Sequence, residues 1–70
     1  MVAILIKSLD DPEYHIRSTA AGRLGGTGDK SAVPKLKQAL NDPDTKVRRH
    51  AARSLRDLTG VDYSDRIKKR

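Results

Sequence analysis

The chain has 70 residues, no cysteine, two aromatic side chains and a formal net charge of +6. A chain of this length forms one small domain that buries about 60% of the surface its unfolded form exposes, and without cysteine it contains no disulfide. The whole net charge falls after Ser31, because residues 1–31 hold four acidic and four basic side chains. This asymmetry predicts a local basic surface and an acidic partner.

The first predicted helix runs from Val2 to Leu9. Its apolar start ends after six residues and has neither a basic leader nor a cleavage site, so it is neither a signal peptide nor a membrane span. We therefore expect a cytoplasmic protein that does not associate with membranes.

The sequence repeats itself at a spacing of 31 residues. The matched positions carry apolar side chains, an Asp-Pro turn and an arginine. They pair Val2, Leu5, Leu9, Asp11, Pro12, Arg17, Ala20, Ala21 and Leu24 with Val33, Leu36, Leu40, Asp42, Pro43, Arg48, Ala51, Ala52 and Leu55. A repeat of this kind indicates a structural unit that recurs.

The second helix of each unit is predicted to begin at Asp11-Pro12 and at Asp42-Pro43, because aspartate caps free N–H groups and proline fits the first helical position. The helices are predicted to end at Gly25-Gly26 and at Gly60. Helical spacing predicts one buried apolar stripe on each helix, formed by Ile16, Ala20 and Leu24 and by Val47, Ala51, Leu55 and Leu58.

The remaining helix is predicted from Ala32 to Leu40, with Ser31 as its cap and Pro34 in its first turn. The chain then divides into repeat one at about residues 2–26, repeat two at about 32–60 and a basic tail at 61–70. Four helices and a short tail make this an all-α protein of two helical hairpins.

The segments Gly28-Asp-Lys-Ser-Ala-Val-Pro34, Leu40-Asn-Asp-Pro-Asp-Thr-Lys-Val47-Arg48 and Ala51-Ala52-Arg-Ser-Leu55 resemble the short HEAT-like repeats first noted in phycobilisome lyases. The resemblance covers about residues 2–60 and implies a short right-handed α-solenoid. It also implies that Arg17 pairs with Asp42 in a ladder between repeats and that Arg48 has a matching structural role. The alternative is that the two arginines line a ligand surface.

The first helix differs from its counterpart, because Ile4 and Ile6 stand where the second unit has Lys35 and Lys37. A helix that is apolar nearly all round is normally buried on every side. We therefore expect a homodimer in which this helix packs against a second copy.

The residues predicted for this self-association are Val2, Ile4 and Ile6. The alternative is that the isoleucines pack under the chain's own tail, against Tyr63 and Ile67.

Four cations are spaced three, four and three residues apart on the last helix, opposite Val47 and Leu55. These are Lys46, Arg49, Arg53 and Arg56, and the tail adds Arg66, Lys68, Lys69 and Arg70. They predict a surface for an acidic protein partner. The alternatives are a nonspecific nucleic-acid binder, which would lack base-stacking aromatics, and a solvated face without a partner.

The sequence pattern argues against a phosphate-binding loop, a metal site and a catalytic site. The glycine-rich segment at residues 25–31 is no phosphate-binding loop, because Asp29 precedes Lys30 and a helix, not a strand, precedes the segment. His15 and His50 occupy unmatched positions and share no metal-ligand spacing. We expect no metal, cofactor, small-molecule substrate or catalytic activity.

Overall fold

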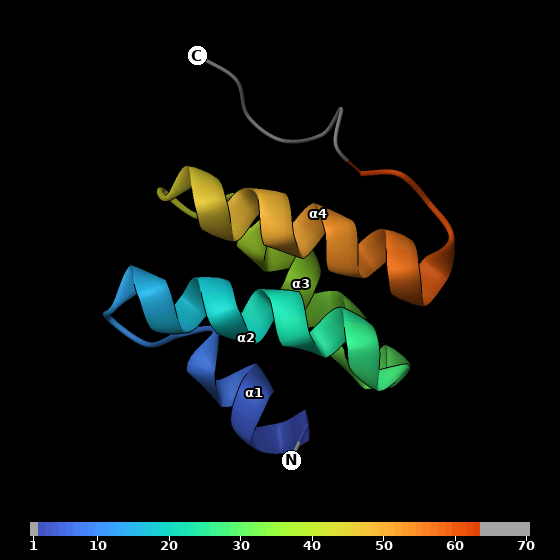
Figure 1. Ribbon diagram of the computed structural model, residues 1–70, viewed down its shortest axis with the longest axis horizontal. Coiled ribbons are helices and arrows are strands. Elements are labelled where there is room, and N and C mark those ends of the chain that lie inside the picture. The colour runs from blue at the N-terminus through green and yellow to red at the C-terminus, as the bar shows by residue number, and fades with distance from the viewer. Residues whose placement is uncertain (1, 64–70) are drawn as a thin grey trace.

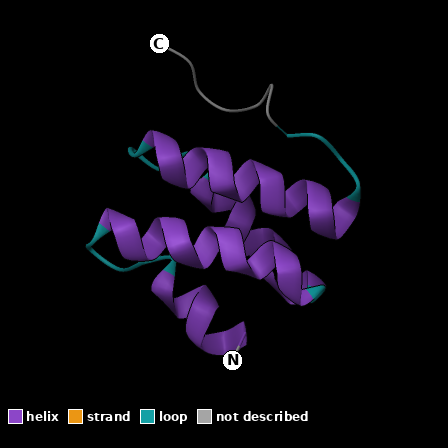
Figure 2. Ribbon diagram, viewed as in Figure 1, coloured by secondary structure: helices purple, strands orange, loops and turns teal. Residues whose placement is uncertain are grey.

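The computed structural model describes residues 2–63, which form helices and loops (Figure 2). The α-helices are α1 (Val2–Ser8), α2 (Tyr14–Thr27), α3 (Val33–Ala39) and α4 (Thr45–Thr59), and one 3₁₀ turn, η1 (Lys30–Ala32), precedes α3. The fold is all-α, and its helices pack as two hairpins, α1 with α2 and α3 with α4.

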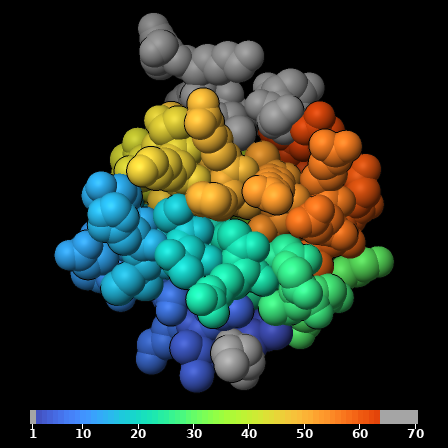
Figure 3. Space-filling view, viewed as in Figure 1, coloured from blue at the N-terminus to red at the C-terminus, as the bar shows by residue number. Residues whose placement is uncertain are grey.

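The two longer helices form the centre of the molecule. α2 and α4 run side by side in the same direction, α1 flanks α2, and α3 lies behind them in Figure 1. Figure 3 shows the atoms of α4, in yellow and orange, directly against those of α2, in cyan and green. The buried apolar side chains are Leu9, Ala20, Ala21, Leu24, Ala32, Leu36, Ala39, Leu40, Val47, Ala51, Ala52, Leu55 and Leu58.

α2 and α4 approach each other most closely at Gly25 and Ser54. The Ser54 hydroxyl donates to the carbonyl of Ala21 and accepts from the Gly25 N–H at 3.1 Å. A Cβ at residue 25 would lie 2.7 Å from Ser54 Oγ and 2.8 Å from Ser54 Cα. Only glycine therefore fits at this point of the contact.

The helix starts differ from the sequence prediction, which placed them at Asp11 and Asp42. Each of these carboxylates instead accepts the N–H two residues on, from Glu13 at 2.8 Å and from Asp44 at 2.9 Å. Such Asx turns compete with direct capping. α4 is capped by Asp44, which accepts from Lys46 N at 2.8 Å. The two helices thus begin two to three residues after the Asp-Pro pairs.

The predicted end of α2 at Gly25-Gly26 is wrong, whereas the predicted end of α4 at Gly60 is confirmed. The left-handed residues that follow the helices are Gly28, with φ 72°, and Gly60, with φ 80°. The first glycine pair remains helical, and Gly25 lies where α2 packs on α4.

Ser31 was predicted to cap the third helix, and this is also wrong. Asp29 caps η1 by accepting from Ser31 N at 2.9 Å. Hydrogen bonds from the side chain and the N–H of Ser31 lower the pKa of Asp29. Pro34 lies in the first turn of α3, as predicted.

Ile16 was predicted to be buried, but its side chain is 43% exposed, while its counterpart Val47 is fully buried. The difference follows from the stacking. α2 covers the face of α4 on which Val47 lies, and no helix among residues 2–63 covers the matching face of α2.

We expect Gly25→Ala to lower the free energy of unfolding by about 1–3 kcal/mol, because the added methyl forces α2 and α4 apart. Gly26→Ala is the matched control, since a Cβ there meets nothing within 4 Å. It should stabilise the helix by about 0.5–1 kcal/mol. Urea unfolding followed by circular dichroism measures both. Equal effects of the two substitutions would contradict the close contact.

Candidate interaction surfaces

A row of cations lies on the exposed side of α4. We call Lys46, Arg49, Arg53 and Arg56 the cationic row; all four side chains are exposed, and Val47 and Leu55 are buried on the opposite side of the helix. The ion pairs formed within residues 2–63 are Arg17–Asp42 and Lys35–Asp10, so none of the row is paired with a carboxylate there. The predicted tail residues Arg66, Lys68, Lys69 and Arg70 lie outside the described residues.

The row contributes little to the stability of α4. Like charges three or four residues apart cost about 0.2–0.5 kcal/mol per pair, and arginines near a helix C-terminus gain about 0.3–1 kcal/mol each from the helix dipole. These contributions are similar in size and opposite in sign. Packing of the helix therefore does not require the row.

The 31-residue repeat shows which face of α4 the cationic row occupies. Its arginines match Ser18, Gly22 and Gly25 of α2. In α2, Ser18 and Gly25 are buried, and a Cβ at Gly22 would lie 3.3 Å from the His50 ring. These small residues form the face of α2 on which α4 packs. The row occupies the same face of α4, which is the end face of the two-hairpin stack.

Arg17 and Asp42, the pair implied by the resemblance, form an ion pair between the hairpins. Arg17 Nε donates to Asp42 Oδ2 at 2.8 Å and Nη2 donates to Oδ1 at 3.3 Å. Arg17 Nη1 also donates to the carbonyl oxygens of Asp11 at 2.8 Å and Pro12 at 3.1 Å. One guanidinium therefore fixes its own turn and the register of the next hairpin.

Arg48, the counterpart of Arg17, makes similar hydrogen bonds through its two Nη atoms but none through its Nε. Its Nη1 donates to the Asp42 carbonyl at 2.7 Å and its Nη2 to Thr45 Oγ1 at 3.0 Å. Its Nε is buried and has no hydrogen-bond partner in the described part of the chain. Leaving such a donor unpaired costs about 1–3 kcal/mol.

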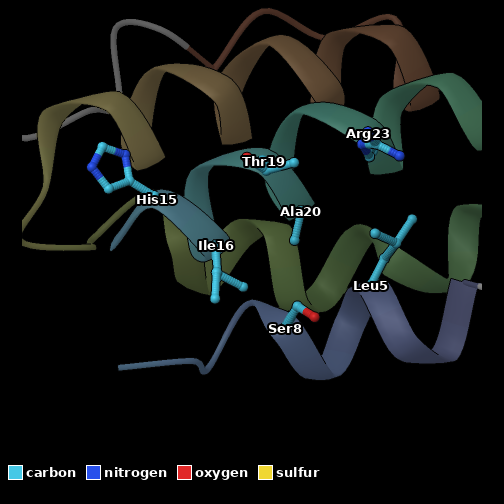
Figure 4. Close-up of a pocket in the computed structure, with 7 residues that line it drawn as sticks. All are labelled: Leu5, Ser8, His15, Ile16, Thr19, Ala20 and Arg23. Atoms are coloured by element: carbon cyan, nitrogen blue, oxygen red, sulfur yellow. The ribbon is translucent and has the colours of Figure 1, made fainter. Parts of the chain in front are cut away.

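A groove of about 340 Å³ lies between α1 and α2 (Figure 4). It is lined by Leu5, Ser8, His15, Ile16, Thr19, Ala20 and Arg23. Most of the matching positions of the second hairpin are buried, namely Leu36, Ala39, Val47, Ala51 and Ser54. The groove is therefore the uncovered counterpart of the surface on which the two hairpins meet.

The residues predicted for self-association differ in exposure. Val2 and Ile6 are half-buried against the protein's own core, whereas Ile4 is 67% exposed. Tyr63 packs against the core with its ring centroid 5.8 Å from Lys37 Nζ. Ile67, the other tail residue named in the alternative that the isoleucines pack under the tail, lies outside the described residues.

Within residues 2–63, no cluster of acidic residues and histidines has a geometry suited to a metal ion, and no helix is long and apolar enough to cross a membrane. His15 lines the groove and stacks on Tyr14 at 4.1 Å, while His50 faces Gly22.

Sequence reasoning missed both the groove and the unpaired Arg48 Nε. A comparison of the matched positions Ser18, Gly22 and Gly25 with Arg49, Arg53 and Arg56 contains the signal that the packing face of α2 and the corresponding face of α4 differ.

A profile described as HEAT repeats matches residues 2–70. No curated protein and no solved structure matches the chain.

We expect Asp42→Asn to lower the free energy of unfolding by about 1–3 kcal/mol, because it removes the negative charge from a partly buried, charge-assisted hydrogen-bond pair. Asp11→Asn is the matched control at the same position of the repeat. Asp11 Oδ1 accepts from Glu13 N and has no arginine partner among the described residues. Urea unfolding of both variants measures the difference, and equal losses would contradict a bridging role for Asp42.

Proposed function

This chain belongs to the HEAT-repeat family, and we propose that it is a non-catalytic interaction module that binds an acidic segment of a protein partner on the cationic row of α4. HEAT repeats generally act as protein-interaction scaffolds and are typically non-catalytic. The observation that carries the proposal is the row itself, four exposed cations on one helix face with no carboxylate partner in residues 2–63.

The chemistry of the row favours carboxylates. From Lys46 to Arg56 it extends about 15 Å along α4 at the helical rise of 1.5 Å per residue. Arginine binds a carboxylate through two parallel hydrogen bonds, which gives geometric selectivity as well as charge attraction. Nucleic-acid binding, the rival function, normally adds aromatic side chains that stack on bases. The described tyrosines, Tyr14 and Tyr63, pack beside His15 and Lys37.

Within the family, we propose that the two hairpins belong to the short HEAT-like repeats first noted in phycobilisome lyases. The support is the Asp-Pro turn and the following arginine, which both hairpins contain and which the structure joins through the hydrogen bond from Arg17 Nη1 to the Asp11 carbonyl.

We propose as a second function that the chain pairs with a second copy through the side formed by α1 and α2. Ile4 is 67% exposed and Ile16 is 43% exposed on this side, and the groove beside Ile16 matches the covered surface of the second hairpin. Val2 and Ile6 of α1 pack on the core and hold the helix that presents Ile4.

The pairing is symmetric, with the same face of both copies in contact. A head-to-tail pair would bring Arg23, the counterpart of Ser54, against Arg56, the counterpart of Gly25. Like charges in a buried contact oppose that arrangement.

We expect a fluorescein-labelled dodecapeptide of aspartate to bind the wild-type chain in fluorescence anisotropy. The variant Arg49→Gln/Arg53→Gln/Arg56→Gln should bind it at least about tenfold more weakly, a loss of about 1.4 kcal/mol. Arg23→Gln, which removes a cation from the groove, is the control and should bind as the wild type does.

A labelled DNA duplex of 12 base pairs is measured in parallel. Tight binding of DNA that falls steeply with salt, together with no binding of the peptide, would contradict the proposal and support the nucleic-acid rival.

Light scattering of the wild-type chain should give the mass of a dimer, and Ile4→Lys/Ile16→Lys should give that of a monomer with an unchanged helical spectrum. Both side chains are partly solvent-exposed, so the substitutions leave the core intact. The control is Lys37→Gln on α3, which should stay dimeric. A wild-type monomer at all concentrations would contradict the pairing.

A further inference from the structure

The Arg17 and Arg48 side chains make the same hydrogen bond to their own turns, but the Nε donor is paired only in Arg17. The Nη1 of each donates to the carbonyl of the aspartate six residues earlier, at 2.8 Å for Arg17 and 2.7 Å for Arg48. Arg17 Nε then donates to the Asp42 carboxylate at 2.8 Å. Arg48 Nε is buried without a partner in residues 2–63. Buried donors in folded proteins are rarely left unpaired, so this atom indicates a missing acceptor.

The two described aspartates of the turn before α4 already accept other hydrogen bonds. Asp42 uses both oxygens on Arg17 and accepts from Asp44 N through Oδ1. Asp44 is the cap of α4 and accepts from the N–H groups of Lys46 and Val47 through Oδ1. In the first hairpin the acceptor at Arg17 comes from the element stacked on it. The acceptor for Arg48 is therefore expected from a molecule that contacts the end face, and since Nε is buried in the free chain, this acceptor reaches it only when the side chains that cover Nε move aside.

A third hairpin stacked as the second is on the first cannot supply that acceptor. α4 reaches α2 because Ser18, Gly22 and Gly25 are small, and even a methyl at residue 25 would come within 2.7 Å of Ser54. The end face of α4 has three arginines at these positions. A molecule that reaches Arg48 must lie farther from the helix axis, where it meets three more guanidinium groups.

We propose that Arg48 is the anchor of a carboxylate-binding site on this end face. One aspartate or glutamate side chain of an acidic segment takes at Arg48 the place that Asp42 takes at Arg17. Once the side chains that cover it have moved aside, Nε donates to one carboxylate oxygen, and the Nη2 hydrogen that does not face Thr45 donates to the other. Arg49, Arg53 and Arg56 bind the neighbouring carboxylates. The site rests on the proposed function, because it names the chemical group by which the acidic partner is recognised.

The test uses the whole ¹⁵N-labelled chain and the arginine Nε–Hε resonances. The unlabelled aspartate dodecapeptide is titrated in, and inorganic phosphate is titrated into a second sample. We expect the Arg48 Hε resonance to move downfield, toward the position of Arg17, and to saturate together with the anisotropy signal. The Arg17 resonance is the internal reference and should not move. Arg48→Lys identifies the Arg48 peak by its loss.

Arg48→Lys also keeps the charge while removing the Nε donor and the planar fork. It should weaken peptide binding about tenfold, whereas the matched variant Arg53→Lys should weaken it by less than about threefold. The melting temperature of each variant is measured alongside, and the resonance shift in the wild-type chain does not depend on either variant folding.

Three other results are possible, and each contradicts a different part of the proposal. If the peptide binds while the Arg48 resonance stays in place and Arg48→Lys binds like the wild type, the anchor is wrong and the proposed function stands. If the peptide does not bind at all, the proposed function fails and the anchor fails with it. If phosphate moves the Arg48 resonance as the peptide does, the site is a general anion site and the assignment to carboxylates is wrong.

Discussion

The Ser54 hydroxyl bridges the Ala21 carbonyl and the Gly25 N–H, and this bridge requires that residue 25 has no side chain. At that short separation the leucines of α2 and α4 are buried in a core with few large side chains. The Arg17–Asp42 ion pair then fixes the register of the hairpins from the turn side. A small domain without cysteine depends on such close, specific packing.

The two ends of the stack carry different kinds of side chain. α2 has small residues where it meets α4, and α4 has arginines at the matching positions. At the opposite end, Ile16 lies in a groove at a position where the second hairpin has a fully buried valine. One end therefore offers charge and the other offers apolar surface. The repeat supplies a common scaffold, and the departures from it supply the candidate functions.

Much of the fold follows from the sequence, because the 31-residue repeat and the apolar spacing predict four helices in two hairpins. The helix ends were less predictable. Asp11 and Asp42 can either cap a helix or close an Asx turn, and local sequence does not decide between these hydrogen bonds.

Gly25 illustrates a second limit, since a glycine that ends a helix and one that admits a neighbouring helix look alike until the neighbour is in place. Ile16 illustrates a third. Its burial depends on a hairpin that residues 2–63 do not provide, so apolar spacing alone predicted it wrongly. The cationic row was visible in the sequence. Its orientation toward the end of the stack and the unpaired Arg48 Nε beside it could be recognised only from the packing of α2 on α4.

We propose that the partner binds the face of α4 that continues the packing face of α2. The most direct measurement is a map of backbone amide chemical shifts along the whole chain while an acidic peptide is added. We expect the largest changes along α4 from Lys46 to Arg56, with small changes in α1 and in the groove side of α2. Changes that centre on the groove, or that spread evenly over all basic residues, would contradict it.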